Sequence, residues 1–129
     1  MVAYSFAPRF APLVEAGTKR QTIRAPWRRH ARPGETLQLY AGMRTRQCRL
    51  LRVAICSAVQ QVEILLSPLA DGVEAGVTLD GIPVEDTEAF ARRDGFERFS
   101  EMVAWWLDTH GCVDFTGVLI SWDWDADGP

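Results

Sequence analysis

The segment GTKRQTIR, residues 17–24, crowds basic and hydroxyl side chains together behind a glycine. A lysine in a partly desolvated cleft can lose its proton near neutral pH. It can then act as a base toward a threonine hydroxyl. Lys19 and Thr22 are therefore candidate catalytic residues, and Arg20 and Arg24 are candidates for holding an oxygen-rich or anionic ligand. The alternative interpretation is an ordinary, solvated basic strand.

The spacing within this segment constrains how its side chains can meet. If residues 20–24 are extended, Arg20, Thr22 and Arg24 share one face of the strand, and Gln21 and Ile23 share the other, with Ile23 toward the core. Residue 19 has the wrong parity to share a face with residue 22. A pairing of the lysine with the threonine therefore requires a turn or a bulge at the start of the strand.

A second candidate region is WRRHARPG, residues 27–34, which combines an aromatic side chain with clustered arginines. Aromatic rings stack on bases, and arginines hold phosphates. Trp27, Arg28 and Arg29 are therefore candidate ligand-binding residues. The alternative is a solvated charged loop with the tryptophan packed against the domain.

The segment FARRDGF, residues 90–96, places Asp94 at the end of a predicted helix. Carboxylates are favourable near helix N-termini and unfavourable near C-termini, so this position needs an explanation. Asp94 either caps the following helix or faces a cation such as Lys19. In the second case it joins Lys19 and Thr22 as a candidate catalytic residue.

The elements that must position these residues follow from periodicity and from turn residues. Strand-like composition or alternation marks residues 2–6, 20–24, 35–40, 46–59, 62–66 and 115–124. Residues 46–59 are long enough to bend or to form two strands, and Asp80-Gly81 between apolar flanks predicts a hairpin. The pattern predicts an α+β fold with a mostly antiparallel sheet.

Helical signals are concentrated toward the C-terminal end. Residues 8–17 form a short helical or turn-like segment that Gly17 ends. Asp86 or Thr87 can cap a helix that Gly95 closes, and Ser100 can cap a second helix that Gly111 closes. Trp105 and Trp106 in the second helix are interpreted as core residues. The tail, residues 125–129, is expected to fray.

The charge is divided unevenly along the chain. Residues 1–60 carry eleven basic and two acidic side chains, and residues 61–129 carry three basic and fifteen acidic ones. The two parts have net charges of +9 and −12, which together give the overall −3. A basic half suggests a phosphate-bearing partner. The alternative is that the two halves pack together and neutralise each other.

Size and composition limit the classes of protein to consider. A chain of 129 residues corresponds to one domain, and its 47% hydrophobic and 24% charged residues are typical of a globular protein. No apolar run is long enough to predict a membrane span, and the N-terminus does not read as a signal peptide. Three cysteines without CxxC spacing suggest free, buried thiols and a cytoplasmic location. The two histidines lie far apart, so no metal site is expected, and nothing calls for a cofactor.

Four segments together resemble the ASCH domain family. They are GTKRQTIR, RPGETLQLYAGMR, FARRDGF and FTGVLISW, and the resemblance runs from about Tyr4 to Trp124. The most specific part is the pattern Gly-x-Lys-x-x-Thr-x-Arg, which Gly17, Lys19, Thr22 and Arg24 match. The resemblance implies a PUA-like fold, a small β-barrel flanked by two or three helices, as a single domain over residues 1–129.

The resemblance also implies a choice of functions. ASCH domains are generally taken to bind RNA, one bacterial branch removes acyl groups from the exocyclic amine of cytidine, and a further member is a ribonuclease. In the amidohydrolase branch the lysine and threonine of the motif work with a glutamate. That glutamate corresponds to or lies near Asp94, which is one methylene shorter. Tyr40 can stack on a base, or it can be a core residue.

Three hypotheses remain open at this stage. The first is recognition of RNA, a nucleobase or a nucleoside, including a modified pyrimidine, in a basic cleft. The second is hydrolysis of an acylated cytidine by Lys19, Thr22 and Asp94, or cleavage of RNA. The third is a protein-interaction module without a ligand, which a cleft closed by Trp27 would favour. The oligomeric state does not follow from the sequence.

Overall fold

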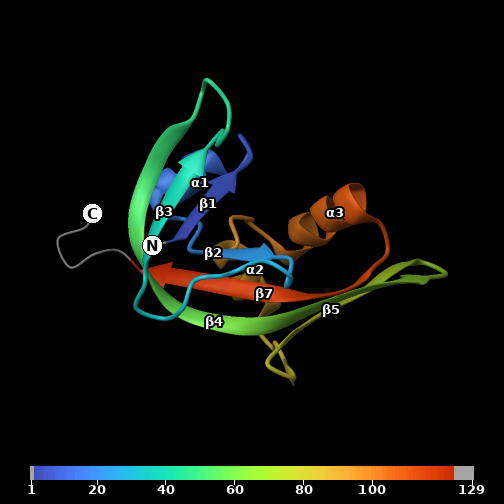
Figure 1. Ribbon diagram of the computed structural model, residues 1–129. Helices are drawn as coiled ribbons and strands as arrows, with labels where there is room; N and C mark the ends of the chain where they lie inside the picture. The colour runs from blue at the N-terminus through green and yellow to red at the C-terminus, as the bar shows by residue number, and fades with distance from the viewer. Residues whose placement is uncertain (1, 124–129) are drawn as a thin grey trace.

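A computed structural model describes residues 2–123 of the chain (Figure 1). The described part contains seven strands and three helices. In chain order they are β1 (Val2–Phe6), α1 (Ala11–Ala16), β2 (Gln21–Arg24), β3 (Thr36–Ala41), β4 (Arg49–Leu69), β5 (Gly72–Leu79), β6 (Ile82–Pro83), α2 (Thr87–Arg93), α3 (Phe99–His110) and β7 (Asp114–Asp123). The predicted tail at 125–129 and the end of the predicted last strand, residue 124, lie outside the described residues.

The strands form one mostly antiparallel sheet. Its order is β1-β3-β4-β5-β6, and β7 pairs with both β4 and β2. Only the β1–β3 pair is parallel among the described pairs. The predicted α+β class and the mostly antiparallel sheet are confirmed. No described pairing joins β1 to β2, so the sheet stays open and the predicted barrel is not confirmed.

The long strand β4 is the centre of the sheet. The expected strands at 46–59 and 62–66 are one strand of 21 residues, so their separation was wrong. Its first part pairs with β3, its middle with β7 and its last part with β5. The β4–β7 register shifts between Cys56 and Ala58, and the β3–β4 register shifts between Leu39 and Tyr40. Such irregularities bend a strand, and β4 is visibly curved in Figure 1.

Local turn chemistry behaves as the residue types predict. Asp80 and Gly81 have φ angles of 49° and 82°, as the two central residues of a tight type I′ hairpin turn require. They join β5 to β6, where Leu79 pairs with Ile82. Gly17 ends α1 with φ 86°, and Gly95 and Gly111 follow α2 and α3 with φ 100° and 77°. The predicted helix ends are therefore confirmed.

The helix starts are confirmed for α2 and wrong for α3. The Asp86 carboxylate accepts a hydrogen bond from Ala89 N at 2.9 Å and caps α2. Helix α3 begins at Phe99, after Arg98, and no side-chain cap is formed there by a neighbouring residue. Ser100 lies inside the first turn. Glu88 of α2 instead accepts the hydrogen bond of Phe99 N at 3.0 Å, so a side chain from another helix satisfies this N–H.

The core joins the sheet to the helices and brings the two oppositely charged halves together. Strand β2 from the basic half pairs with β7 from the acidic half. The largest fully buried side chains come from both halves of the chain: Trp122, Leu37, Leu39, Met102, Ile120, Gln21, Val14, Val62 and Cys56. The basic and acidic halves of the sequence are therefore interleaved in the folded chain. In particular, the charge split does not separate the folded chain into a basic and an acidic body.

The cysteines and helices bear on two further expectations. All three thiols are free, but only Cys56 is buried, while Cys48 and Cys112 are exposed. The expectation that all three are buried was wrong, because Cys48 and Cys112 lie in loops before β4 and after α3. None of the helices within residues 2–123 combines the length and hydropathy needed to span a bilayer.

Candidate functional site

Lys19 is placed by the turn between α1 and β2. After Gly17, the backbone N–H groups of Thr18 and Lys19 both donate to Leu13 O, at 2.9 and 3.1 Å. The strand begins only at Gln21. Lys19 is therefore outside the regular strand, which removes the parity conflict with Thr22. Both side chains line the same cavity.

Lys19 and Asp94 form a buried pair. Lys19 is 3% exposed and Asp94 is 5% exposed. Lys19 Nζ donates to the backbone oxygen of Asp94 at 2.6 Å and lies 3.5 Å from its Oδ1. Gln21 Nε2 donates to the same Oδ1 at 3.3 Å. Of the two expected roles of Asp94, the structure shows the cation partner, whereas the cap of the next helix is wrong because Glu88 serves there.

Burial acts on both members of this pair. It lowers the pKa of the Lys19 amine from its usual value, and the nearby Asp94 carboxylate opposes this shift. It raises the pKa of Asp94, and Lys19 and Gln21 oppose that shift. Desolvation penalises the charged form of each group, so the two pKa values move toward each other. The pair is thus closer to exchanging its proton than an exposed lysine and aspartate would be.

Thr22 and Arg24 make a second polar cluster on β2. Thr22 Oγ1 accepts a hydrogen bond from Arg24 Nε at 2.9 Å, and Arg24 Nη2 donates to Ser5 O of β1 at 2.8 Å. The guanidinium carbon lies 5.2 Å from the Tyr4 ring centre and 5.1 Å from the Phe6 ring centre. Arg24 therefore bridges β2 to β1 at the place where the sheet is open. Burial lowers its pKa from the usual value.

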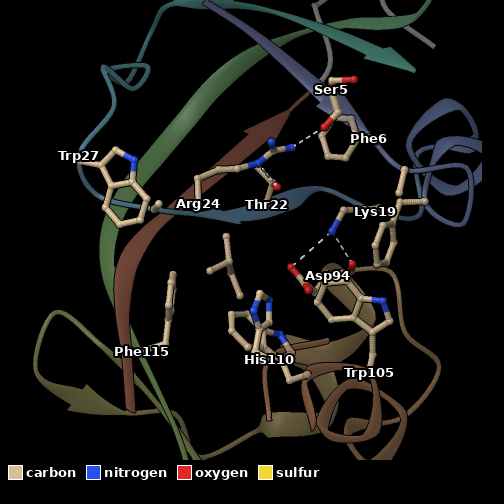
Figure 2. Close-up of a pocket in the computed structure, with 15 residues that line it drawn as sticks. Ser5, Phe6, Lys19, Thr22, Arg24, Trp27, Asp94, Trp105, His110 and Phe115 are labelled. Carbon is tan, nitrogen blue, oxygen red and sulfur yellow. Dashed lines mark hydrogen bonds and ion pairs between the residues drawn. The ribbon is translucent and has the colours of Figure 1, made fainter. Parts of the chain in front are cut away.

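These groups line a cavity of about 500 Å³. Figure 2 shows Lys19 and Trp27 at opposite ends, with Thr22 and Arg24 between them. Aromatic side chains from α3 and β7 form the facing side, including Trp105, His110 and Phe115. The complete lining is Ser5, Phe6, Ala7, Phe10, Lys19, Thr22, Ile23, Arg24, Ala25, Trp27, Asp94, Trp105, Trp106, His110 and Phe115. The cavity thus has a polar floor and an aromatic wall. The floor is formed by Lys19, Thr22, Arg24 and Asp94, and the wall by Trp105, Trp106, His110 and Phe115.

Five of the nine predicted site residues line this cavity, namely Lys19, Thr22, Arg24, Trp27 and Asp94. The other four do not. Arg20 is exposed, and its Nε donates to Gly17 O. Arg29 donates to Glu35, and Tyr40 on β3 donates to Gln38. Arg28 is exposed, although its charge contributes to lowering the pKa of Arg24.

Trp27 is 82% exposed and stands at the edge of the cavity. The sequence left open whether it packs against the domain or is available to a ligand. Its exposure shows that it does not pack into the core, nor does it cover the cavity. A closed cleft would have favoured a domain without a ligand, and that condition is not met.

The aromatic wall is the part of the site that sequence reasoning missed. Trp106 is buried, as expected of a core residue, but it also lines the cavity, as does the half-buried Trp105. The ring centroids of Trp106 and His110 are 4.7 Å apart, and those of Trp106 and Phe115 are 5.2 Å apart. The spacing of four residues between Trp106 and His110 places them on one helix face. That spacing was the available signal, but it could not indicate which face met β2.

Within residues 2–123, no three His, Cys, Asp or Glu side chains are arranged to hold a metal ion. The chemistry available from the described cavity residues is that of an amine, a carboxylate, a hydroxyl, a guanidinium and an imidazole. Comparison with protein-family models, with curated proteins and with solved structures gave no match.

Proposed function

We propose that the cavity recognises a single nucleobase or nucleoside, either free, as a modified pyrimidine, or as part of RNA. The observation that carries this proposal is the pairing of an aromatic wall with a polar floor in a cavity of about 500 Å³. A small-molecule site is usually about 300–1,000 Å³ and mostly apolar, with a few directed polar groups. A base is planar, and its edge carries hydrogen-bond donors and acceptors. This combination matches a ring held against the wall with its edge toward β2.

The groups on the floor suit the edge of a pyrimidine. Arg24 and Lys19 are hydrogen-bond donors. Asp94 is an acceptor, and its Oδ1 already accepts a hydrogen bond from Gln21 Nε2. The Thr22 hydroxyl accepts from Arg24 and still has a proton to donate. A site that hydrogen-bonds the edge of its ligand discriminates strongly, because a wrong ligand leaves buried polar groups unpaired. The resemblance to ASCH domains points to the same class of ligand.

Binding is tested by titrating the protein with cytidine, with N(4)-acetylcytidine and with a short single-stranded RNA, using tryptophan fluorescence and calorimetry. We expect saturable binding that Phe115→Ala weakens, because that ring belongs to the wall. For RNA, the logarithm of affinity should fall with the logarithm of salt concentration, with a slope of about −0.7 per phosphate neutralised. Absence of binding of all three ligands at low salt would sink the proposal.

A second candidate, hydrolysis of an acylated cytidine, is favoured by one specific observation. Thr22 Oγ1 accepts from Arg24 Nε, which stabilises negative charge on that oxygen and leaves its proton for a base. Lys19 lines the same cavity, and burial lowers its pKa. A neutral lysine is the form that a general base requires.

The reaction follows from these roles. Neutral Lys19 takes the proton of Thr22 as Oγ1 attacks the acyl carbon, and Arg24 stabilises the resulting oxyanion. The carbon–nitrogen bond then breaks, and Lys19 returns the proton to the departing amine. Water, deprotonated by Lys19, attacks the acyl-threonine. The bond from the acyl carbon to Thr22 Oγ1 breaks, Lys19 returns the proton to that oxygen, and the acid is released. Asp94 orients the lysine through the contacts at 2.6 and 3.5 Å.

The assay for this candidate follows release of acetate from N(4)-acetylcytidine. Thr22→Val and Lys19→Ala should each abolish turnover, and the double variant should be no worse than either, since the two act as a unit. Thr22→Ser is the matched control, because it keeps the hydroxyl. Asp94→Glu should be tolerated, and Asp94→Asn should fail. No turnover by the wild type, or full activity of Thr22→Val, would leave binding as the only function of the cavity.

A further inference from the structure

Arg24 differs from the other cation on the cavity floor because no carboxylate of residues 2–123 forms an ion pair with it. Its two hydrogen bonds go to Thr22 Oγ1 and Ser5 O, both neutral acceptors. Lys19, in contrast, lies 3.5 Å from Asp94 Oδ1. Within residues 2–123, none of the ion pairs shorter than 4.0 Å includes Arg24. The floor therefore carries one positive charge more than its acid neutralises.

The surroundings compensate this charge only in part. The rings of Tyr4 and Phe6 offer their π faces at 5.2 and 5.1 Å, a partial compensation at best. The exposed Arg28 adds a second positive charge that lowers the pKa of Arg24, as burial does more strongly. The attraction from Asp94 is the weakest influence on that pKa. Arg24 is half-buried. A charge withdrawn from water is normally paired, and the missing partner is most simply a part of the ligand.

The guanidinium has the donors to hold such a partner. It carries more N–H groups than the two hydrogen bonds use, and it lines the cavity. The bonds from Nε to Thr22 and from Nη2 to Ser5 hold the guanidinium plane in place. A fixed guanidinium binds a carboxylate or phosphate through parallel hydrogen bonds. These bonds pre-organise Arg24 for an oxyanion.

We propose that the physiological ligand is a planar heterocycle carrying an oxyanion, either a ring carboxylate or a nucleotide phosphate, and that Arg24 binds this group while the rings of the wall hold the heterocycle. This inference rests on the proposed function and narrows it to an acidic ligand. It also gives the two cations of the floor different roles. Lys19 is neutralised by Asp94 within the protein, whereas Arg24 is neutralised by the ligand.

The test compares ligands that differ in charge but share a ring. Cytidine 5′-monophosphate is titrated against cytidine, and uracil-6-carboxylate against uracil, by calorimetry at low salt. We expect one anionic ligand to bind about tenfold or more tightly than its neutral partner, because a hydrogen bond to a charged group contributes more than one to a neutral group. The pair that shows the preference identifies the source of the oxyanion. The preference should shrink as salt is raised from about 0.05 M to about 0.5 M.

Variants assign the preference to Arg24. Arg24→Gln should weaken the anionic ligand much more than its neutral partner and so remove the preference, and Arg24→Lys should keep part of it. Arg28→Gln is the control for general attraction and should reduce the preference only slightly. If Arg24→Gln unfolds, Arg24→Lys takes its place: a reduced preference supports the proposal, and an undiminished preference overturns it.

The outcomes separate this inference from the function on which it rests. Equal binding of neutral and anionic ligands overturns the inference and leaves nucleoside recognition standing. No binding of any of the four ligands overturns the inference, and failure of N(4)-acetylcytidine and single-stranded RNA to bind as well overturns the proposed function. A preference that survives in Arg24→Gln shows that another cation holds the oxyanion, which also overturns the inference.

Discussion

Lys19 and Arg29 are both basic residues next to an acid, but one belongs to the cavity floor and the other to the rim loop, residues 25–35. The side chains of Lys19 and Asp94 are 4% and 7% exposed, and their closest charged atoms are 3.5 Å apart. Those of Arg29 and Glu35 are 63% and 23% exposed and lie closer, at 3.1 Å. The shorter pair is the weaker one, because water and salt screen it and its side chains lose more freedom in forming it. Burial, more than the distance between the charged atoms, therefore decides which ion pair is stronger.

The two regions also differ in how their backbones are held. Two of the floor residues, Thr22 and Arg24, lie on β2, which pairs with β7 over its four residues. The rim loop is tied at its root by Tyr4, whose hydroxyl accepts from Ala31 N at 3.2 Å and lies 3.0 Å from His30 Nδ1. His30 Nε2 in turn lies 2.6 Å from Ala25 O. The root is fixed, and Trp27 stays exposed between these anchors, so the loop presents an aromatic ring without burying it.

The largest expected effect comes from breaking the buried pair. Asp94→Ala leaves Lys19 without its acid, and we expect the free energy of unfolding to fall by about 3–5 kcal/mol. Urea denaturation measures the loss. The control is Glu35→Gln on the rim loop, for which we expect a much smaller change. Similar losses for both variants would show that the floor pair is no more important than the rim pair.

A further variant of the buried pair, Asp94→Asn, predicts a dependence of stability on pH. In Asp94→Asn the attraction that raises the pKa of Lys19 is gone, while burial and, less strongly, the charge of Arg24 still lower it. Between this lowered value and the ordinary one of 10.5, the folded chain binds fewer protons than the unfolded chain. Stability should therefore rise with pH in that window, more steeply than in the wild type. Urea denaturation at about pH 6 and about pH 9 gives the slope, and an unchanged slope would contradict the assigned cause.

The next largest effect is expected from replacing Gly117 by alanine, compared with the same change at Gly34. A Cβ on Gly117 of β7 would lie 2.5 Å from Arg24 O and 2.5 Å from Phe115 Cε2, whereas one on Gly34 of the rim loop would meet nothing within 4 Å. Gly117→Ala should destabilise the fold by about 1–3 kcal/mol and also lower ligand affinity, because it pushes on both sides of the cavity. Gly34→Ala, with φ 91°, should cost about 1–2 kcal/mol and leave affinity unchanged. Loss of affinity in both would show that the rim loop also shapes the cavity.

Removing the ring of Trp27 should change binding and leave stability nearly unchanged. The side chain is 82% exposed, so Trp27→Ala should alter the free energy of unfolding by less than about 0.5 kcal/mol. If a base stacks on it, affinity should fall by about 1–3 kcal/mol. Trp27→Phe keeps a ring and should retain most of the affinity. Thermal melts and fluorescence titrations separate the two effects, and a large loss of stability would mean that the ring packs against the domain.

The smallest effect concerns the rim arginines. Arg29→Gln should reduce the salt dependence of single-stranded RNA binding by at most about 0.7 in the logarithmic slope, the contribution of one phosphate. Arg98→Gln is the control, because Arg98 is exposed but belongs to the acidic half and does not line the cavity. Equal changes of the slope in both variants would indicate a general effect of net charge and would argue against a contact between the rim loop and RNA.

Features that depend on a few neighbouring residues followed from the sequence. The hairpin at Asp80-Gly81, the Asp86 cap and the glycines after the helices all have the conformations that their residue types favour. The exception is Ser100, because Glu88 from another helix supplied the acceptor that local reasoning assigned to the serine. The strand break expected before residue 62 failed for a similar reason. Pairing with β3, β7 and β5 in turn holds β4 as one strand.

For the candidate site, the sequence by itself determined the reactive groups and only part of their arrangement. It identified Lys19, Thr22, Arg24 and Asp94 because their types and spacing are local properties. The tertiary structure decided that Lys19 is neutralised by an acid 75 positions away and that Arg24 has no ion pair with an acid of the described part of the chain. It also placed Trp106, His110 and Phe115 opposite β2. Burial, pairing and the facing wall are set by which surfaces pack together, and residue spacing along one segment carries no information about the segment packed against it.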